Sequence, residues 1–194
     1  MISIAQLQDL VGGFDIRGDE RSAIGRLRTL QLLQQGVRAF DRHNYSPGHV
    51  TASGIVLSRA LDVVLLVHHG RLGRWLQPGG HVEAEDRDIV QTAVREILEE
   101  TGVSVSPDSA ELLGIHLHEI PVRGSEPAHQ HFDFMWGFRT EATPTQSPAV
   151  RWQAIKGLVD VGADPSVLRA VERAAARDVS TQQGTMACRL RGSG

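Results

Sequence analysis

The sequence predicts an α/β (α+β) sandwich that is preceded by an N-terminal helical arm. Aliphatic and β-branched runs of strand length recur between residues 50 and 155. Two segments with helical periodicity, 86–101 and 165–177, interrupt and follow these runs. Strands and helices in this order favour one sheet with helices packed on it. The segment before residue 45 has helical spacing alone, so it is predicted to form a separate arm.

The arm covers residues 1–44. Ile2–Leu10 form a short amphipathic piece, and a longer helix follows. Aliphatic residues recur in this second helix at spacings of three and four: Ile24, Leu27, Leu30, Leu33 and Val37. We expect this stripe to be buried, because an apolar face of this size is unfavourable in water. The arm is predicted either to cap the following domain or to pair two subunits as a homodimer.

The main domain covers residues 45–178, and its elements follow in order. A hairpin comes first, because two β-branched runs flank a short polar segment. Next come a loop, a long helix with Gly102 at its C-terminus, three strands, and a final helix with Pro165 in its first turn. The predicted ranges are 50–57 and 63–67 for the hairpin, 71–80 for the loop and 86–101 for the long helix. The three strands are predicted at 112–122, 129–140 and 150–155, and the final helix at 165–177. The polar, Gly-rich tail, 179–194, is expected to be flexible.

The composition excludes several classes of protein. The 194 residues carry 20 Lys and Arg against 23 Asp and Glu, so no nucleic-acid partner is expected. An uncharged apolar stretch of about 18 residues, which a membrane span requires, does not occur in the sequence. Cys188 is the single cysteine, which permits neither an internal disulfide nor a cysteine-rich zinc site. With no secretory signal visible at the start, we expect a cytoplasmic protein without a membrane partner.

The helix at 86–101 gathers negative charge on one side. Glu96, Glu99 and Glu100 fall within an arc of about 100°, and the opposite face is apolar. Like charges three and four residues apart destabilise a helix by about 0.2–0.5 kcal/mol per pair, and Arg95 is placed to compensate Glu99 only. Carboxylate oxygens are the ligands that Mg²⁺ and Mn²⁺ prefer. The arc therefore predicts a metal site, and the alternative is a solvated acidic face.

The residues around this helix resemble the Nudix box. That pattern consists of Gly, five residues, Glu, seven residues, Arg-Glu, an aliphatic residue, any residue, Glu-Glu, any residue, Gly and an aliphatic residue. R-E-I-L-E-E-T-G-V at 95–103 matches its second half at every specified position. The first half departs, because Arg95 follows Gly80 by fifteen residues where the pattern has fourteen. A one-residue insertion is implied, with Glu85 or Asp86 in the early acidic position.

Membership of the Nudix hydrolases (MutT-like) would imply an α/β/α sandwich on a mixed sheet. It would also imply hydrolysis of a diphosphate bond in a nucleoside diphosphate linked to another group. By position, Glu96, Glu99 and Glu100 would hold Mg²⁺, or Mn²⁺, with the Gly79 carbonyl as a further ligand. Arg95 would orient Glu99. As an alternative to binding the metal, Glu96 would serve as the general base.

A second function remains open at this point, namely a non-catalytic Nudix-fold module that senses a nucleotide. Such a module is expected to lose carboxylates from the box. This chain retains Arg95, Glu96, Glu99 and Glu100, which favours the enzyme.

Outside the box, histidines alternate on two predicted strands, so each set shares one sheet face: His116 and His118, and His129, His131 and Asp133. Imidazole pairs bind transition metals. We favour the other interpretation, in which these residues line the substrate cleft or hydrogen-bond across strands.

Further residues near the box have candidate roles in binding. Glu119 and Glu126 are candidates for an additional acidic ligand. Trp75 is a candidate for stacking on a base, although a buried anchor is the favoured role. The residues predicted to meet phosphate at the cleft entrance are His68, His69, Arg71 and Arg74.

Overall fold

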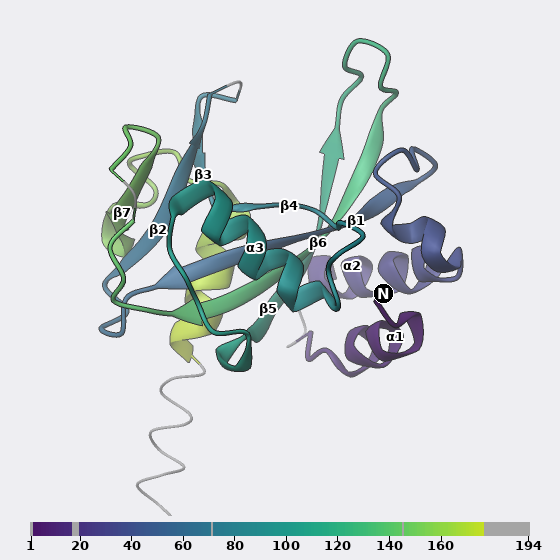
Figure 1. Cartoon of the computed structure of the whole chain (residues 1–194), viewed down its shortest axis with the longest axis horizontal. Helices are drawn as coiled ribbons and strands as arrows, with labels where there is room; N and C mark the ends of the chain where they lie inside the picture. The colour runs from purple at the N-terminus through teal and green to yellow at the C-terminus, as the bar shows by residue number, and fades with distance from the viewer. Residues whose placement is uncertain (1, 17–19, 71, 145, 177–194) are drawn as a thin grey trace, which may run out of the picture.

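The computed structural model describes residues 2–16, 20–70, 72–144 and 146–176. Along the chain, two helices are followed by four strands, a third helix, three more strands and a fourth helix (Figure 1). The helices are α1 (Ile4–Gly13), α2 (Glu20–Leu33), α3 (Ile89–Thr101) and the final helix at 165–176. The strands are β1 (Gly48–Leu57), β2 (Val63–His69), β3 (Arg74–Leu76), β4 (Gly79–His81), β5 (Glu111–Ile120), β6 (His129–Arg139) and β7 (Val150–Ala154). The expected tail, 179–194, lies outside the described residues.

All seven strands belong to one mixed sheet. Its central order is β3-β2-β1-β6-β5, while β4 pairs with β1 and β7 pairs with β2. The long β1–β6 pairing is parallel and runs from Gly48 opposite Gln130 to Leu57 opposite Arg139. Figure 1 shows α3 crossing in front of the sheet and the final helix behind it. The predicted α/β sandwich with a mixed sheet is therefore confirmed.

The predicted hairpin is correct at its turn and incomplete beyond it. β1 pairs with β2 at Leu57 and Val64, next to the turn. The two strands then separate, because β1 pairs with β4 and β6 whereas β2 pairs with β3 and β7. The predicted loop at 71–80 contains β3 and the start of β4, each only three residues long. Strands this short do not show the alternation from which a strand is predicted.

The side chains of β1 alternate between two hydrophobic clusters. Val50 and Ala52 pack in the same cluster as Ile97 of α3. Ile55 and Leu57 pack with Val167 of the final helix. Each strand residue is therefore assigned to one layer of the sandwich, as the twofold alternation of a strand requires.

The arm packs against the domain with a different face from the one expected. In α2 the buried positions include Ser22, Gly25 and Thr29. Three members of the predicted stripe are instead exposed, with Ile24 at 44%, Leu27 at 59% and Val37 at 65%. Of the other two members, Leu33 is buried and Leu30 packs partly against the core.

The reason for this reversal is the close approach of α2 to the sheet. A Cβ atom on Gly25 would collide with the backbone carbonyl of Ile115 in β5. The helix backbone thus lies directly on the strand, and only small side chains fit at the contact. A contact face built from Ser, Gly and Thr is polar in sequence, so hydrophobic periodicity identifies the wrong side of the helix.

Deleting residues 1–40 should lower the melting temperature strongly or make the protein insoluble. The arm contributes Leu7, Val11, Leu32 and Leu33 to the main core cluster. Each fully buried side chain of this type is worth about 1.5–3 kcal/mol. Thermal unfolding of the full chain and of the truncated chain would measure the difference. An unchanged melting temperature would contradict the packing described here.

None of the helices in the described ranges is long and apolar enough to span a membrane.

Candidate active site

Helix α3 is fixed at both ends by its own caps. The side chain of Asp88 accepts a hydrogen bond from the Gln91 N–H at 2.8 Å. At the other end, Gly102 adopts a left-handed backbone with φ 71°, and its N–H donates to the Leu98 carbonyl at 2.8 Å. Glycine adopts this conformation without strain. The helix starts three residues later than predicted. The two caps fix the ends of the helix whose carboxylates lie above β4.

Strand β4 places two glycines beneath these carboxylates. The Gly79 N–H donates to Glu100 Oε2 at 3.0 Å. A Cβ atom on Gly80 would overlap the carboxylate of Glu96. Any larger residue at position 80 would therefore displace Glu96. The Gly-Gly pair allows the helix to lie close to the strand.

Arg95 connects the elements of the site. Its Nη2 donates to the His81 carbonyl at 2.7 Å, and its Nη1 donates to Glu96 Oε1 at 2.9 Å and to Glu99 Oε2 at 3.3 Å. Burial alone would lower the pKa of Arg95, but hydrogen bonds to Asp86 and Glu96 outweigh it and raise the pKa. Arg95 therefore contacts Glu99 as the sequence predicted, and it holds Glu96 by a shorter bond.

Asp86, and not Glu85, is the acidic partner of Arg95. Asp86 is 3% exposed, and it accepts hydrogen bonds from Arg95 Nε at 3.2 Å, Arg95 Nη2 at 3.1 Å, Thr92 Oγ1 at 2.8 Å and the Glu83 N–H at 2.9 Å. Burial would raise the pKa of this carboxyl, but the bonds from Arg95 and the backbone lower it. Glu85 is exposed. The additional residue of the box therefore lies between Asp86 and Arg95, because five residues separate Gly80 from Asp86, as the pattern requires.

The carboxylates above β4 are partly desolvated. Burial raises the pKa of Glu96 and of Glu100, and a neighbouring glutamate adds to the rise in each case. Arg95 and the Gly79 N–H offset part of this effect. The Glu99 side chain is 55% exposed. Arg95 is bonded to one oxygen of Glu96 and one of Glu99, so the donor set that remains consists of carboxylate oxygens. Carboxylate oxygens are the donor type that a hard divalent cation prefers.

A family model described as NUDIX domain matches residues 48–152, a range that includes β1, β4, the whole of α3 and the carboxylates just described. The chain belongs to the Nudix family.

Individual Nudix relatives match over shorter segments. The chain is 39% identical to the phosphatase NudJ of Escherichia coli K12 over 59 residues, which are 30% of this chain and 38% of NudJ. It is 46% identical over 43 residues to the m7GpppN-mRNA hydrolase NUDT17 of Danio rerio, covering 21% of this chain and 14% of that protein. Among solved structures, the mutator MutT protein of Bacillus halodurans has a TM-score of 0.50 and 28% identity, covering 63% of this chain and 79% of the other.

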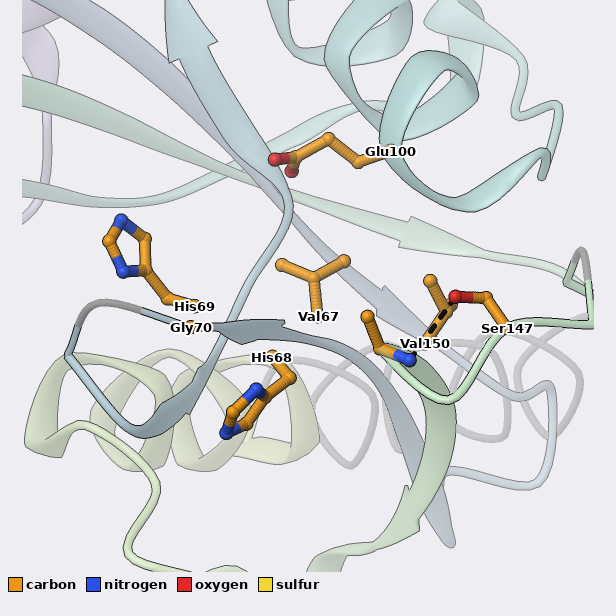
Figure 2. A pocket seen from close by; sticks show the side chains of 8 residues that line it. Val67, His68, His69, Gly70, Glu100, Ser147 and Val150 are labelled. Carbon is orange, nitrogen blue, oxygen red and sulfur yellow. Dashed lines mark hydrogen bonds between the residues drawn. The ribbon is translucent and has the colours of Figure 1, made fainter.

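A cleft of about 500 Å³ opens beside the Nudix helix. Figure 2 shows Glu100 reaching from α3 toward the end of β2, where His69 lies. The residues that line the cleft are Val67, His68, His69, Gly70, Glu100, Ser147, Ala149 and Val150. The structure thus brings His68 and His69 to the same cleft as one carboxylate of the box.

The other residues predicted to contact substrate near the cleft entrance either contact protein groups or lie outside the described residues. Arg74 forms an ion pair with Asp164 at 3.9 Å. The guanidinium of Arg151 lies 3.9 Å from the centre of the Trp75 ring, so that face of Trp75 is covered. Arg71 lies outside the described residues.

Glu119 and Glu126 lie at the far end of the β5–β6 hairpin. Glu126 pairs through its backbone with Arg123, at 2.8 and 2.9 Å. Their role as additional acidic ligands stays a prediction.

The histidine pattern on β5 and β6 does share one sheet face, the face opposite α3. His116 lies opposite Asp133 in the strand register. Asp133 is buried, accepts hydrogen bonds from Thr51 Oγ1 at 3.1 Å and Ser53 Oγ at 2.6 Å, and lies 3.7 Å from His118. Burial would lower the pKa of His118, but Asp133 outweighs it and raises the pKa. His118 and Asp133 thus face each other across the two strands, but His118 Nε2 and Asp133 Oδ2 are too far apart for a hydrogen bond. The predicted cleft-lining or hydrogen-bonding role of these histidines stays a prediction.

A second group on this face includes a histidine that the sequence did not indicate. His49 of β1 lies opposite His131 of β6, and their ring centres are 4.7 Å apart. His129 and His81 complete the group, which we call the histidine cluster (His49, His81, His129 and His131). Burial, with the neighbouring rings, lowers the pKa of His131 to about 3 and that of His81 to about 4, so both are neutral at pH 7. Only the parallel β1–β6 pairing brings His49 to the cluster, and no local sequence signal indicates that pairing.

Proposed function

We propose that the chain is a metal-dependent pyrophosphohydrolase of the cytoplasm. Its substrate class is a nucleoside diphosphate linked to another group, and Mg²⁺, or Mn²⁺ in its place, is the cofactor. One observation carries the proposal. Glu96 and Glu100 lie together, partly desolvated, and Glu100 lines a cleft large enough for a small molecule. A helix face selected for stability alone would not place carboxylates that repel each other one turn apart.

Each residue of the box has a task in this proposal. Glu96, Glu99 and Glu100 hold the cation, and the Gly79 carbonyl supplies a further oxygen. When bound, a divalent cation would neutralise phosphate oxygens and would lower the pKa of a bound water. Arg95 fixes Glu96 and Glu99 by hydrogen bonds and is itself held by Asp86. Glu100 also lines the cleft, which places it to accept the proton of the attacking water.

Turnover should therefore stop on chelation. Treating the enzyme with EDTA should abolish hydrolysis, and adding Mg²⁺ or Mn²⁺ in excess should restore it. Phosphate release after coupling to a pyrophosphatase or phosphatase would follow the reaction. Turnover that survives complete chelation would show that the carboxylates do not hold a catalytic cation.

We propose that residues 1–44 cap the Nudix domain, 45–178, and also pair two subunits. The exposed positions Ile24 and Leu27 lie on the side of α2 away from the sheet and are suited to contact a second copy. Leu27→Asp should then convert the dimer to a monomer, and this monomer should remain folded, because Leu27 is exposed within one chain. Sedimentation of both proteins would test this, and equal masses for the two would exclude α2 as the interface.

A further inference from the structure

Three imidazoles of the histidine cluster meet at one point on the sheet face opposite the Nudix helix. His49 extends from β1, and His129 and His131 extend from β6. One ring nitrogen from each lies within 4.8 Å of the other two. Among the described residues, this is the group of side chains whose potential ligand atoms converge in this way.

Backbone carbonyls orient two of the three rings. His49 Nδ1 lies 3.2 Å from the Asn44 carbonyl, and His129 Nδ1 lies 2.8 Å from the Pro127 carbonyl. A carbonyl oxygen can only accept, so both Nδ1 atoms carry the proton and donate. With the proton on Nδ1, the Nε2 atom of each ring is the nitrogen left to bind a ligand. Metal-ligating histidines are held in the same way, by a carbonyl or carboxylate on the second ring nitrogen.

The lone pair of His49 is buried without a partner. His49 is 1% exposed, and its Nε2 has no hydrogen-bond partner in the structure. A buried polar atom without a partner is unusual and points to a ligand, an ion or a water at that position. The atom lies in the group that His129 and His131 complete, which supplies the other donors.

The spacing of the nitrogens agrees with shared coordination. His129 Nε2 lies 3.2 Å from His131 Nε2. Two Zn–N bonds of about 2.0–2.1 Å at the tetrahedral angle separate their nitrogens by about 3.3–3.4 Å. A small adjustment of the rings is enough to place both atoms on one ion.

We propose that His49, His129 and His131 bind one transition-metal ion of the zinc class through their Nε2 atoms. His81 is the nearest additional imidazole, with its ring centre 5.0 Å from that of His49 and 5.2 Å from that of His131. Imidazole nitrogens suit zinc, copper, iron and nickel, whereas Mg²⁺ prefers oxygen. This site is chemically distinct from the carboxylate site and does not depend on the proposed hydrolysis.

Strand β4 joins the two sites. The Gly79 N–H and the His81 carbonyl of this strand bond to Glu100 and to Arg95 on one side, at 3.0 and 2.7 Å. The His81 ring lies in the histidine cluster on the other side. An ion that engages His81 would thus fix the strand on which the Nudix helix rests.

Cobalt is the probe for this site, because its visible absorption reports the ligand set and zinc displaces it. The full-length protein would be stripped with chelator, exchanged into excess Mg²⁺ to occupy oxygen sites, and titrated with Co²⁺. We expect one Co²⁺ per chain, an absorption spectrum of nitrogen coordination, and its loss on adding Zn²⁺.

Variants separate the two sites. His49→Gln and His131→Gln should each weaken Co²⁺ binding on the order of 100-fold or more, beyond the 10–100-fold typical of losing an outer-sphere partner. His43→Gln, at a side chain that is 70% exposed, and Glu100→Gln should bind as the unmodified protein does. Circular dichroism would verify that each variant folds. If His49→Gln does not fold, the Co²⁺ titration of His131→Gln tests the proposal in its place. The proposal is overturned if Co²⁺ does not bind in excess Mg²⁺, or if binding depends on Glu100 and not on the histidines.

Discussion

Replacing Glu100 with glutamine is expected to lower kcat by about 100- to 1,000-fold, the loss typical of one preorganised electrostatic contact. The free energy of unfolding of the metal-free protein should stay the same or rise by about 0.2–0.5 kcal/mol, because the repulsion from Glu96 disappears. Burial and the other glutamates raise the pKa of Glu100, so its ionised form is the less favourable one in the folded chain. A glutamine oxygen still accepts from the Gly79 N–H, which keeps the local geometry.

The opposite signs of the two effects make this substitution informative. Replacing a carboxylate that binds the catalytic metal lowers kcat without lowering stability, whereas replacing a solvated carboxylate changes neither quantity. The measurements are kcat at saturating Mg²⁺ and the melting temperature without metal. Glu172→Gln, at an exposed position of the final helix, is the matched control and should retain both values. Near-full kcat in Glu100→Gln would mean that the acidic face of α3 is merely solvated.

Replacing Asp86 with alanine is expected to destabilise the protein by about 3 kcal/mol, and the melting temperature should fall by roughly 6–12 °C. The substitution removes a buried carboxylate that accepts from Arg95, Thr92 and the Glu83 backbone. It also leaves the buried guanidinium of Arg95 without its main counter-charge, so kcat should fall as Glu96 loses its orientation. Denaturant unfolding would measure the free energy.

The adjacent, exposed Glu85 supplies the control. Glu85→Ala should change the free energy of unfolding by less than about 0.5 kcal/mol. The pH dependence should also differ. The pKa of Asp86 is lower folded than unfolded, so its contribution is complete above its ordinary pKa near 3.8 and is lost as the pH falls through the folded value. The gap in stability between the unmodified protein and Asp86→Ala should therefore begin to narrow as the pH falls below about 4. Equal losses in both variants would contradict the assignment of Asp86.

The elements with strong local signals could be predicted from the sequence. The long strands and α3 have clear periodicity, and R-E-I-L-E-E-T-G-V fixed the register of the box glutamates. The sequence leaves the early acidic position of the box open between Glu85 and Asp86, because it does not reveal on which side of the acid the additional residue lies. The buried hydrogen bonds of Asp86 settle this point.

Features that depend on non-local contacts could not be predicted. The packing face of α2 is set by a close backbone approach at Gly25, and hydropathy does not detect such a contact. The histidine cluster needs His49, which only the parallel pairing of β1 with β6 brings beside His131. Strands β3 and β4 are three residues long and form because longer neighbours offer backbone partners.

The most direct test is a screen for phosphate release from a library of diphosphate compounds, with the unmodified protein and Glu100→Gln in parallel. Both proteins would be assayed in Mg²⁺ and in Mn²⁺ after coupling to a pyrophosphatase or phosphatase. The proposed function predicts that the unmodified protein hydrolyses at least one nucleoside diphosphate derivative and that Glu100→Gln loses most of this activity. A compound that binds tightly and is never cleaved would indicate a nucleotide-sensing module, and turnover that is equal in the two proteins would contradict the role given to the Nudix carboxylates.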